Sequence, residues 1–322
     1  MTTRLPLVLA LALSVALPAA AQDWPRDRTT ITLGFGPGSG VDLLARVVTE
    51  ALAARHPGKV FLVENKPGAG GSTSVETVVR GPTDGTLIAG VVSAPIIMNP
   101  VMMKVSYDPW KDLRPVTIIG ATPSVLLVSK KLGVKTVAEF VALLKKEPGK
   151  YPYSSMGAGT TSHMSMELAA SLAGSSMLHV PFRSTPEALQ ALITGDVAAS
   201  TIPIGIAAEH MEAGTVVPLA LTSAKRWPTF PDLPTTGEVG MKDIPVDSYV
   251  ALFVSAATPK PIVDAIHADI KAIVAVPAVA EKIGRIYYRP VANTPEEYAA
   301  ALVIERNQWE PLIHKLGLAR KE

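Results

Sequence analysis

The sequence predicts an α/β protein built from two units, each with a parallel-rich sheet flanked by helices. First, short apolar runs alternate with amphipathic helical patterns along most of the chain. Second, Gly-rich or Ser/Thr-rich turns follow several of these runs, where a parallel strand would pass into a helix. Third, this plan begins again near residue 125. Since ligands bind outside the carboxyl ends of parallel strands, two such sheets facing one another predict a cleft.

The composition excludes several classes of protein. The chain has 322 residues, a formal net charge of +2 and no cysteine. Its basic residues are scattered, so the sequence carries no electrostatic footprint for nucleic acid. Without cysteine there are no disulfides, thiolate metal sites, Fe–S clusters, cysteine nucleophiles or lipid-modified cysteines. The length exceeds what a single core usually supports, which favours two domains.

The first residues have the pattern of an export signal. A short basic start at 1–4 precedes an apolar run at 5–17, Pro18 breaks the run, and 19–21 supplies three small alanines. The alternative, a membrane span, needs about 20 apolar residues, which is longer than this run. We expect a signal peptide at 1–21, cleaved near Ala21, and a periplasmic mature chain.

The elements of the first unit follow one another as strand, turn and helix. We expect strands at 30–33, 59–64 and 86–92, and helices at 41–54 and from about residue 72. Gly-rich turns at 34–40 and 65–71 join each of the first two strands to its helix. Thr73 and Glu76 fit a capping box at the start of the second helix.

The second unit repeats the plan and the chain then returns to the first. The expected strands are 124–129, 150–155, 177–181 and 216–222, with a return strand at 248–255. Helices are expected after Thr136 and Glu139, from the turn 156–163 to residue 172, and from the segment 183–187. Two more are expected after Thr258-Pro259 and after the capping pattern of Thr294 and Glu297.

Motifs for nucleotides, metals and catalysis are absent from the sequence. In the segment 34–40 (GFGPGSG), Ser39 stands where a dinucleotide fingerprint needs its third glycine, and there is no phosphate-binding P-loop. No nucleophile elbow or H-E-x-x-H pattern occurs, and the six histidines do not cluster at metal spacing. We therefore predict no enzyme, no cofactor and no metal. Free N–H groups at helix N-termini remain able to bind an anion such as a carboxylate.

Several polar residues allow both a structural and a binding role. Asp42 lies at a helix start, where a carboxylate either complements the helix dipole or orients the loop and a ligand-bound water. His163 is either a capping histidine or part of a site, and His179 favours a structural hydrogen bond. Arg183 either pairs with a ligand carboxylate or lies at the rim. Small hydroxyl residues that could be plain N-caps gather at strand ends in both units, which favours binding; they are Ser39, Thr160, Thr161, Ser184 and Thr185.

Several segments, in order, carry a family resemblance over essentially the whole mature chain. The most specific are 35–42 (FGPGSGVD) and 64–71 (ENKPGAGG). Further matching segments are 107–113, 153–163, 179–182 and 222–235. In these motifs the chain resembles the substrate-binding proteins of the tripartite tricarboxylate transporter family, also called Bug receptors.

The resemblance implies a two-domain Venus-flytrap receptor, type II-like, with two interdomain crossovers. We expect domain 1 at 22–124 and 250–322 and domain 2 at 125–249. It also implies capture of a small organic anion in the cleft, two integral membrane transporter subunits as partners, and a monomer. Applied to the matching motifs of this chain, the resemblance implies that the ligand is contacted by Gly36, Ser39, Asp42, Ala69, Gly70, Ser155, Thr160, Thr161 and His163. Our candidate set adds Phe35, Ser93, Arg183, Ser184 and Thr201.

Departures from the family pattern suggest the ligand class. Valine stands at position 41 where members often have threonine, and Ala198 replaces a common acidic residue and is followed by small side chains. From this we expect a roomier, partly apolar pocket for an aromatic or other bulky mono- or dicarboxylate rather than an amino acid, whose ammonium group would need a carboxylate partner. The alternative function is a sensor that presents ligand to a signalling partner without transport.

Overall fold

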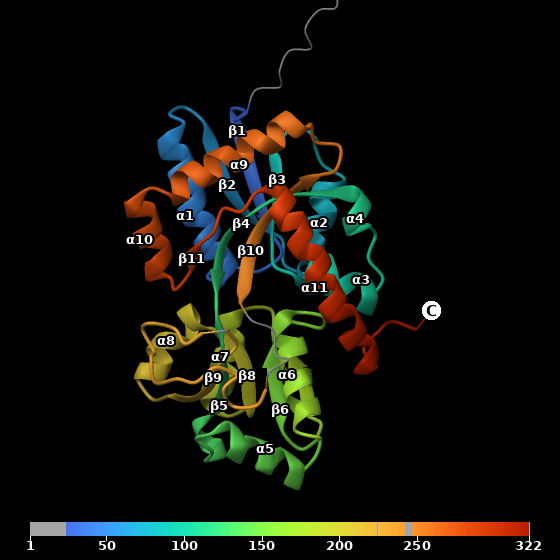
Figure 1. The fold of residues 1–322 in the computed structure, drawn as a ribbon, viewed down its shortest axis with the longest axis vertical. Coiled ribbons are helices and arrows are strands. Elements are labelled where there is room, and N and C mark those ends of the chain that lie inside the picture. Colours follow the sequence, from blue (N-terminus) through green and yellow to red (C-terminus); the bar gives the residue numbers. More distant parts are fainter. Residues whose placement is uncertain (1–23, 224, 242–246, 322) are drawn as a thin grey trace, which may run out of the picture.

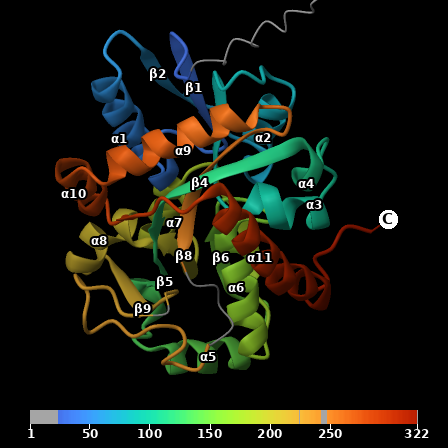
Figure 2. The same cartoon turned by 45° about the horizontal axis from the view of Figure 1, so that its top comes forward.

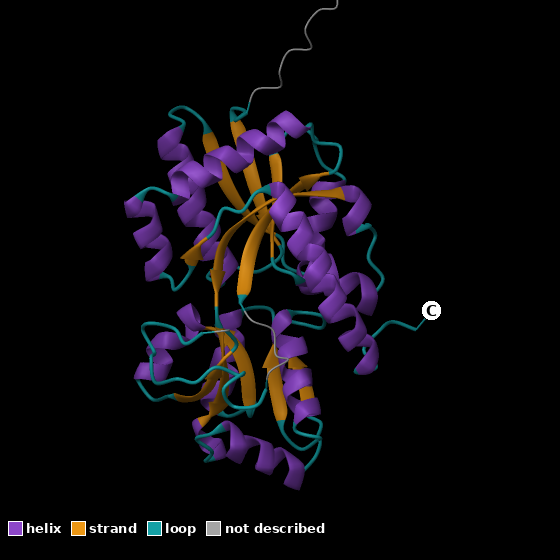
Figure 3. Ribbon diagram, viewed as in Figure 1, coloured by secondary structure: helices purple, strands orange, loops and turns teal. Residues whose placement is uncertain are grey.

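The computed structural model describes residues 24–223, 225–241 and 247–321. They form two units along the long axis of the molecule, each with a central sheet and helices outside it (Figures 1 and 3). The predicted signal segment 1–21 lies outside the described residues. None of the helices in the described part of the chain combines the length and apolar character needed to traverse a bilayer.

The first unit combines the N-terminal part of the chain with its C-terminal part. In chain order its elements are β1 (Arg28–Leu33), α1 (Gly40–Arg55), β2 (Val60–Asn65), η1 (Ala69–Gly71), α2 (Ser72–Val79), β3 (Leu87–Val91), η2 (Ala94–Met98), α3 (Asn99–Met102), α4 (Pro109–Asp112), β4 (Leu113–Thr122), β10 (Ser248–Ser255), α9 (Lys260–Val274), α10 (Pro277–Arg285), β11 (Arg289–Pro290) and α11 (Pro295–Lys315). Its sheet has the strand order β11-β4-β10-β3-β1-β2.

The second unit is formed by one continuous stretch of chain. Its elements are β5 (Ser124–Ser129), η3 (Lys130–Leu132), α5 (Val137–Lys146), β6 (Pro152–Ser155), α6 (Thr161–Leu172), β7 (Leu178–Pro181), α7 (Thr185–Thr194), β8 (Ala199–Pro203), α8 (Ile204–Glu212) and β9 (Val216–Leu221). Its sheet has the order β7-β6-β8-β5-β9.

The predicted α/β class with flanking helices is confirmed, and both sheets are mixed. β1 runs parallel to β2 and β3, and β6 runs parallel to β7 and β8. The antiparallel pairs involve β10, β4 and β11 in one sheet and β5, β8 and β9 in the other. Antiparallel pairing therefore comes mainly from the strands next to the points where the chain crosses between the units.

Both faces of each sheet are buried, which explains the continuous apolar runs of the strands. In β10, Val250, Leu252 and Val254 pack with α1 and α9, whereas Ala251 and Phe253 pack on the opposite face with α2 and α11. Figure 2 shows α1 and α9 on one side of β4 and α11 on the other. In β5 the same alternation directs successive residues toward α5 and α6 or toward α7 and α8. Because successive residues of a strand point to opposite faces of the sheet, helices pack on both faces.

The two units meet where the chain crosses between them. Only Pro123 separates β4 from β5, and the two strands form one extended path through the molecule (Figure 1). The returning chain lies beside it, because Thr222 donates its N–H to the carbonyl of Ser124 at 2.8 Å and the hydroxyls of Ser124 and Ser248 are 3.4 Å apart. Met164 of α6 also packs into the core of the first unit. This arrangement supports the proposed division into two domains.

Two local predictions have clear outcomes. The capping boxes at Thr136 and Thr294 are present at the starts of α5 and α11. The predicted capping box of Thr73 and Glu76 is wrong. Helix α2 begins at Ser72 after Gly71, whose φ is +99°, and no side chain caps it. The Ser72 hydroxyl instead contacts the amide nitrogen of Asn99 at 2.8 Å and the Tyr107 hydroxyl at 3.0 Å. Strands β4, β8 and β11 and helices α8 and α10 were not predicted.

Candidate functional site

A cavity of about 690 Å³, counted out to its mouth, lies between the two sheets. Its wall is formed by residues of both units and of both segments that cross between the units. Most of the wall consists of buried side chains. The lining residues are Phe35, Ser39, Gly40, Val41, Val92, Ser124, Ser155, Met156, Thr160, Thr161, Ser162, Thr185, Ala188, Ser200, Thr201, Ile202, Pro203, Ser248, Tyr249 and Tyr288.

Four helices present their first residues to this cavity. The wall includes the N-cap of α1 (Ser39), the N-cap of α6 (Thr160), the first residue of α7 (Thr185) and the N-cap of α8 (Pro203). The N-terminal end of a helix dipole carries partial positive charge and free N–H groups. Among the described residues that line the cavity, none is acidic or basic. The electrostatic field inside the cavity therefore favours an anion and comes from the backbone.

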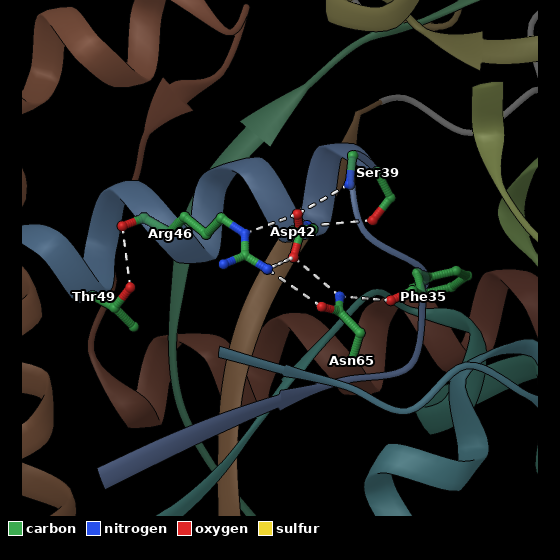
Figure 4. A network of polar contacts seen from close by, with 7 residues as sticks. Phe35, Ser39, Asp42, Arg46, Thr49 and Asn65 are labelled. Carbon is green, nitrogen blue, oxygen red and sulfur yellow. Dashed lines mark hydrogen bonds and ion pairs between the residues drawn. The ribbon is translucent and has the colours of Figure 1, made fainter. Parts of the chain in front are cut away.

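The first wall segment, the turn between β1 and α1, is held by Asp42 from behind (Figure 4). One carboxylate oxygen of Asp42 accepts from the N–H of Gly38 at 3.0 Å, and the other accepts from Asn65 Nδ2, also at 3.0 Å. Arg46 donates to both oxygens, at 3.0 and 2.9 Å. Asn65 also donates to the carbonyl of Phe35 at 2.9 Å. The network ties the turn to α1 and to the end of β2.

The electrostatics of Asp42 agree with this role. Burial by itself raises the pKa of Asp42, but the hydrogen bonds from Arg46, Gly38 and Asn65 outweigh it, so the pKa is lowered. Asp42 is 2% exposed and does not line the cavity, and neither does Gly36. The structure thus places Asp42 where it orients the loop, one of the two roles considered from the sequence.

Ser39 and Thr201 are two buried residues of the wall whose hydroxyl has an uncommitted donor. Ser39 accepts the N–H of Asp42 at 3.3 Å as the cap of α1, which leaves its own O–H free to donate. Thr201, in the middle of β8, is 4% exposed and its Oγ1 has no hydrogen-bond partner among the described residues. A buried hydroxyl without a partner is costly, which makes Thr201 a candidate donor in the wall.

Four other hydroxyls of the second unit, those of Ser155, Thr160, Thr161 and Ser162, lie around the turn between β6 and α6. Thr160 caps α6 by accepting the N–H of His163 at 3.3 Å and donates to the carbonyl of Gly157 at 2.7 Å. Thr161 and Ser162 follow it in the wall. Three of the candidate residues from this unit, Ser155, Thr160 and Thr161, therefore lie together at the cavity.

His163 lies behind this turn rather than in the cavity wall. It is 4% exposed, and its Nδ1 accepts the N–H of Gly159 at 3.3 Å. Burial, with a smaller effect of the neighbouring His179, lowers the pKa of His163 to about 4. The ring is therefore neutral at pH 7. This placement agrees with a structural role for His163, one of the two roles considered from the sequence.

A second cavity adjoins the first and is separated from it by Phe35 and Met156, which line both. It measures about 1030 Å³, open solvent included. Its wall contains the second Gly-rich turn with Ala69 and Gly70, and also Arg183. The second Gly-rich turn therefore lines only the adjoining cavity, whereas the first turn lines both, with Ser39 and Gly40 at the first cavity and Gly34 at the second.

Two other candidates lie outside both cavities. Ser184 caps α7 by accepting the N–H of Glu187 at 3.4 Å. Ser93 is buried at the end of β3, where its hydroxyl lowers the pKa of Glu305. Burial is the largest influence on Glu305 and raises its pKa, and Tyr249 donates its hydroxyl to Glu305 at 2.5 Å. Ser93 thus contributes to a polar group behind Tyr249 of the wall.

Two tyrosines of the wall were not predicted from the sequence. Tyr249 and Tyr288 come from β10 and from the segment before β11, far in sequence from the Gly-rich turns. No local motif marks them, because the pairing of β10 with β3 and β4 brings Tyr249 to the wall and the pairing of β11 with β4 brings Tyr288 there. Ala198, on which we based the larger pocket, precedes β8 and does not line the cavity. Ala198 therefore does not enlarge this cavity.

Fold and cavity together define a solute-binding protein of the periplasmic type, with two α/β units enclosing a ligand site. The model of the tripartite tricarboxylate transporter family receptor matches residues 44–318. The chain belongs to this family, a family of solute receptors that work with tripartite transporters and are not enzymes.

Known relatives cover nearly the whole chain. A Cupriavidus necator protein is 30% identical over 309 residues, which span 95% of this chain and 93% of that protein. A solved R. palustris structure with adipate has a TM-score of 0.87 at 28% identity and covers 92% of this chain and 99% of that one. MatC from Rhodopseudomonas palustris with bound malate has a TM-score of 0.83 at 26% identity, with 90% and 100% covered.

Proposed function

We propose that this chain is a periplasmic receptor that captures a small organic carboxylate in the cavity between its two units. The observation that carries the proposal is the convergence of four helix N-termini on a cavity whose described wall contains hydroxyls and no charged side chain. Such a site holds an anion through N–H and O–H donors and needs no buried lysine or arginine. The receptor is exported by the segment 1–21 and delivers the ligand to two integral membrane transporter subunits.

The ligand class follows from what the wall offers and what it lacks. Phe35, Tyr249 and Tyr288 provide aromatic surface against which the carbon skeleton of a ligand can pack. An amino acid would bring an ammonium group, and the described wall has no carboxylate to pair with it. The ligand we propose is an aromatic or other bulky mono- or dicarboxylate. The adipate and malate complexes of relatives support a carboxylate.

The proposed function is tested with a ligand panel of adipate, malate, benzoate, phthalate and L-glutamate. We expect thermal stabilisation and saturable calorimetric binding with at least one of the carboxylates that lack an ammonium group, because a ligand that binds only the folded state stabilises it. L-Glutamate is expected to bind weakly. Tight binding of L-glutamate with no response to the other four compounds would contradict the ligand class.

Thr201→Val tests the unpartnered hydroxyl in the wall. The change removes a buried hydroxyl that lacks a partner, so we expect the ligand-free protein to unfold at the same or a slightly higher temperature. Affinity for the best carboxylate of the panel is expected to fall about 10- to 100-fold, as for a lost hydrogen bond to a charged group.

Thr29→Val is the matched control for this experiment. Thr29 is 1% exposed, also has an unpartnered Oγ1, and lies in β1 away from the cavity. Its replacement is expected to affect thermal stability like that of Thr201 and to leave the dissociation constant unchanged. Equal affinities of the two variants would show that Thr201 does not bind the carboxylate.

A further inference from the structure

Tyr288 of the cavity wall has a buried hydroxyl that no other described residue engages. The side chain is 5% exposed, and the residue lines the cavity. Burial raises the pKa of Tyr288, and neither a neighbouring charge nor a hydrogen bond contributes to this shift. The hydroxyl therefore keeps its proton at pH 7 and is free to donate it. A buried hydroxyl without a partner is costly, and one in a cavity wall is available to a ligand.

Two glycines in regular elements form the seat of the Tyr288 ring. Gly40 is the first residue of α1, and a Cβ there would lie 2.5 Å from the Tyr288 hydroxyl oxygen and 3.4 Å from the ring carbon that carries it. Gly120 lies in β4, and a Cβ there would lie 3.3 Å from Cδ1 of the same ring. Neither glycine has a positive φ, so the backbone does not require glycine at either position. The two glycines instead leave room for a phenol whose hydroxyl lies against the start of α1.

The backbone on both sides of Tyr288 fixes its position. The N–H of Tyr288 donates to the carbonyl of Ile283 at 3.1 Å. The carbonyl of the preceding residue, Tyr287, accepts the Thr122 hydroxyl at 2.7 Å. Directly after Tyr288 the chain pairs with β4, because β11 begins at Arg289. A donor that is held in place before the ligand arrives loses little conformational freedom on binding.

The Tyr288 hydroxyl lies beside the other donors of the first wall segment. Ser39 has a free O–H as the cap of α1, and the N–H groups of Gly40 and Val41 have no acceptor within the helix. These three residues line the cavity together with Tyr288. A carboxylate has two oxygens and about four acceptor positions, so it can accept from the backbone and from both hydroxyls at once.

We propose that Tyr288 is a specificity-determining residue whose hydroxyl donates a hydrogen bond to the ligand carboxylate at the start of α1. The inference rests on the proposed function and deepens it, because it names the side chain that contacts the carboxylate from the C-terminal part of the chain. An apolar group of a ligand at this position would leave the buried hydroxyl without a partner. The site therefore discriminates between a carboxylate and an apolar group of similar size.

Tyr288→Phe removes the hydroxyl and keeps the ring in its seat. Because the hydroxyl has no partner among the described residues, we expect the ligand-free variant to unfold at the same or a slightly higher temperature. Calorimetry with adipate, or with the tightest-binding compound of the panel, is expected to show about 10- to 100-fold weaker binding, as for a lost hydrogen bond to a charged group. A crystal structure of the wild-type complex is expected to show the hydroxyl oxygen about 2.5–2.7 Å from a carboxylate oxygen.

Tyr298→Phe is the matched control for this experiment. Tyr298 is 1% exposed and lies in α11 outside the cavity wall, so the loss of its hydroxyl should leave the dissociation constant unchanged. Equal affinities of Tyr288→Phe and wild type, an equal loss of affinity in Tyr298→Phe, or a complex in which the Tyr288 hydroxyl contacts no ligand oxygen would overturn this inference and leave the proposed function intact. If the wild-type protein binds no carboxylate of the panel, the proposed function itself fails and this inference fails with it.

Discussion

Ala188→Phe is expected to abolish carboxylate binding while the protein stays folded. Ala188 lies in the first turn of α7, is 2% exposed and lines the cavity. A phenyl ring at this position enters space that is otherwise available to the ligand and faces the hydroxyls of the second unit. Because close-packed walls yield little, the ring and a bulky ligand cannot share the cavity. Calorimetry with the best compound of the panel is expected to show at least a 100-fold loss of affinity.

Ala191→Phe provides the matched control on the same helix. Ala191 lies three residues further along α7, is 7% exposed and packs into the core between α7, α8 and the sheet. Its replacement overpacks that core, with an expected loss of about 1–3 kcal/mol in the free energy of unfolding. Ala188→Phe should lose affinity with little loss of stability. If Ala188→Phe bound normally, the cavity would not be the ligand site.

Asp42→Ala is expected to lower the free energy of unfolding by about 2–3 kcal/mol, the typical result of losing hydrogen bonds to a buried charged group. The Arg46 side chain is 52% exposed and returns to water, so the ion pair alone contributes little. The larger loss comes from the Gly38 N–H and the Asn65 amide, which lose their acceptor. Urea denaturation of the wild-type and Asp42→Ala proteins at pH 7 measures the difference.

The stability difference should depend on pH in a defined direction. The pKa of Asp42 in the folded protein is lowered from the ordinary value of 3.8. The carboxylate therefore contributes its full stabilisation above pH 3.8 and loses it as the pH falls through the lower folded-state pKa. Asp42→Asn keeps one acceptor oxygen and should lose less stability than Asp42→Ala. A difference between wild type and Asp42→Ala that stayed constant down to pH 2 would contradict the assigned role of the charge.

Local signals in the sequence predicted most elements, and long-range contacts explain the failures. Thr136 and Thr294 were recognised as capping boxes because all partners lie within one helical turn. The same pattern failed at Thr73, where Asn99 and Tyr107 hold the preceding Ser72 hydroxyl and the helix start follows that tertiary contact. Strand β4 escaped prediction because its burial comes from pairing with β10, more than 100 residues away in the chain.

The candidate site was predictable to the extent that it follows strand ends. Ser39 follows β1 and Ser155 ends β6, and both line the cavity. Thr201 lies in the middle of β8, which was not predicted. Gly-rich turns alone did not show that two compartments exist, since the division depends on where Phe35 and Met156 meet. The tyrosines of the wall also escaped, because their positions depend on how the C-terminal part of the chain returns to the first unit.

The buried wall of the cavity has a consequence for the speed of exchange. Met164 of α6 packs into the core of the first unit, and Tyr287 of the first unit packs against the core of the second. These contacts must separate for the two units to move apart. We expect the exchange of a ligand to depend on how often the units open, as well as on the strength of the ligand's own hydrogen bonds.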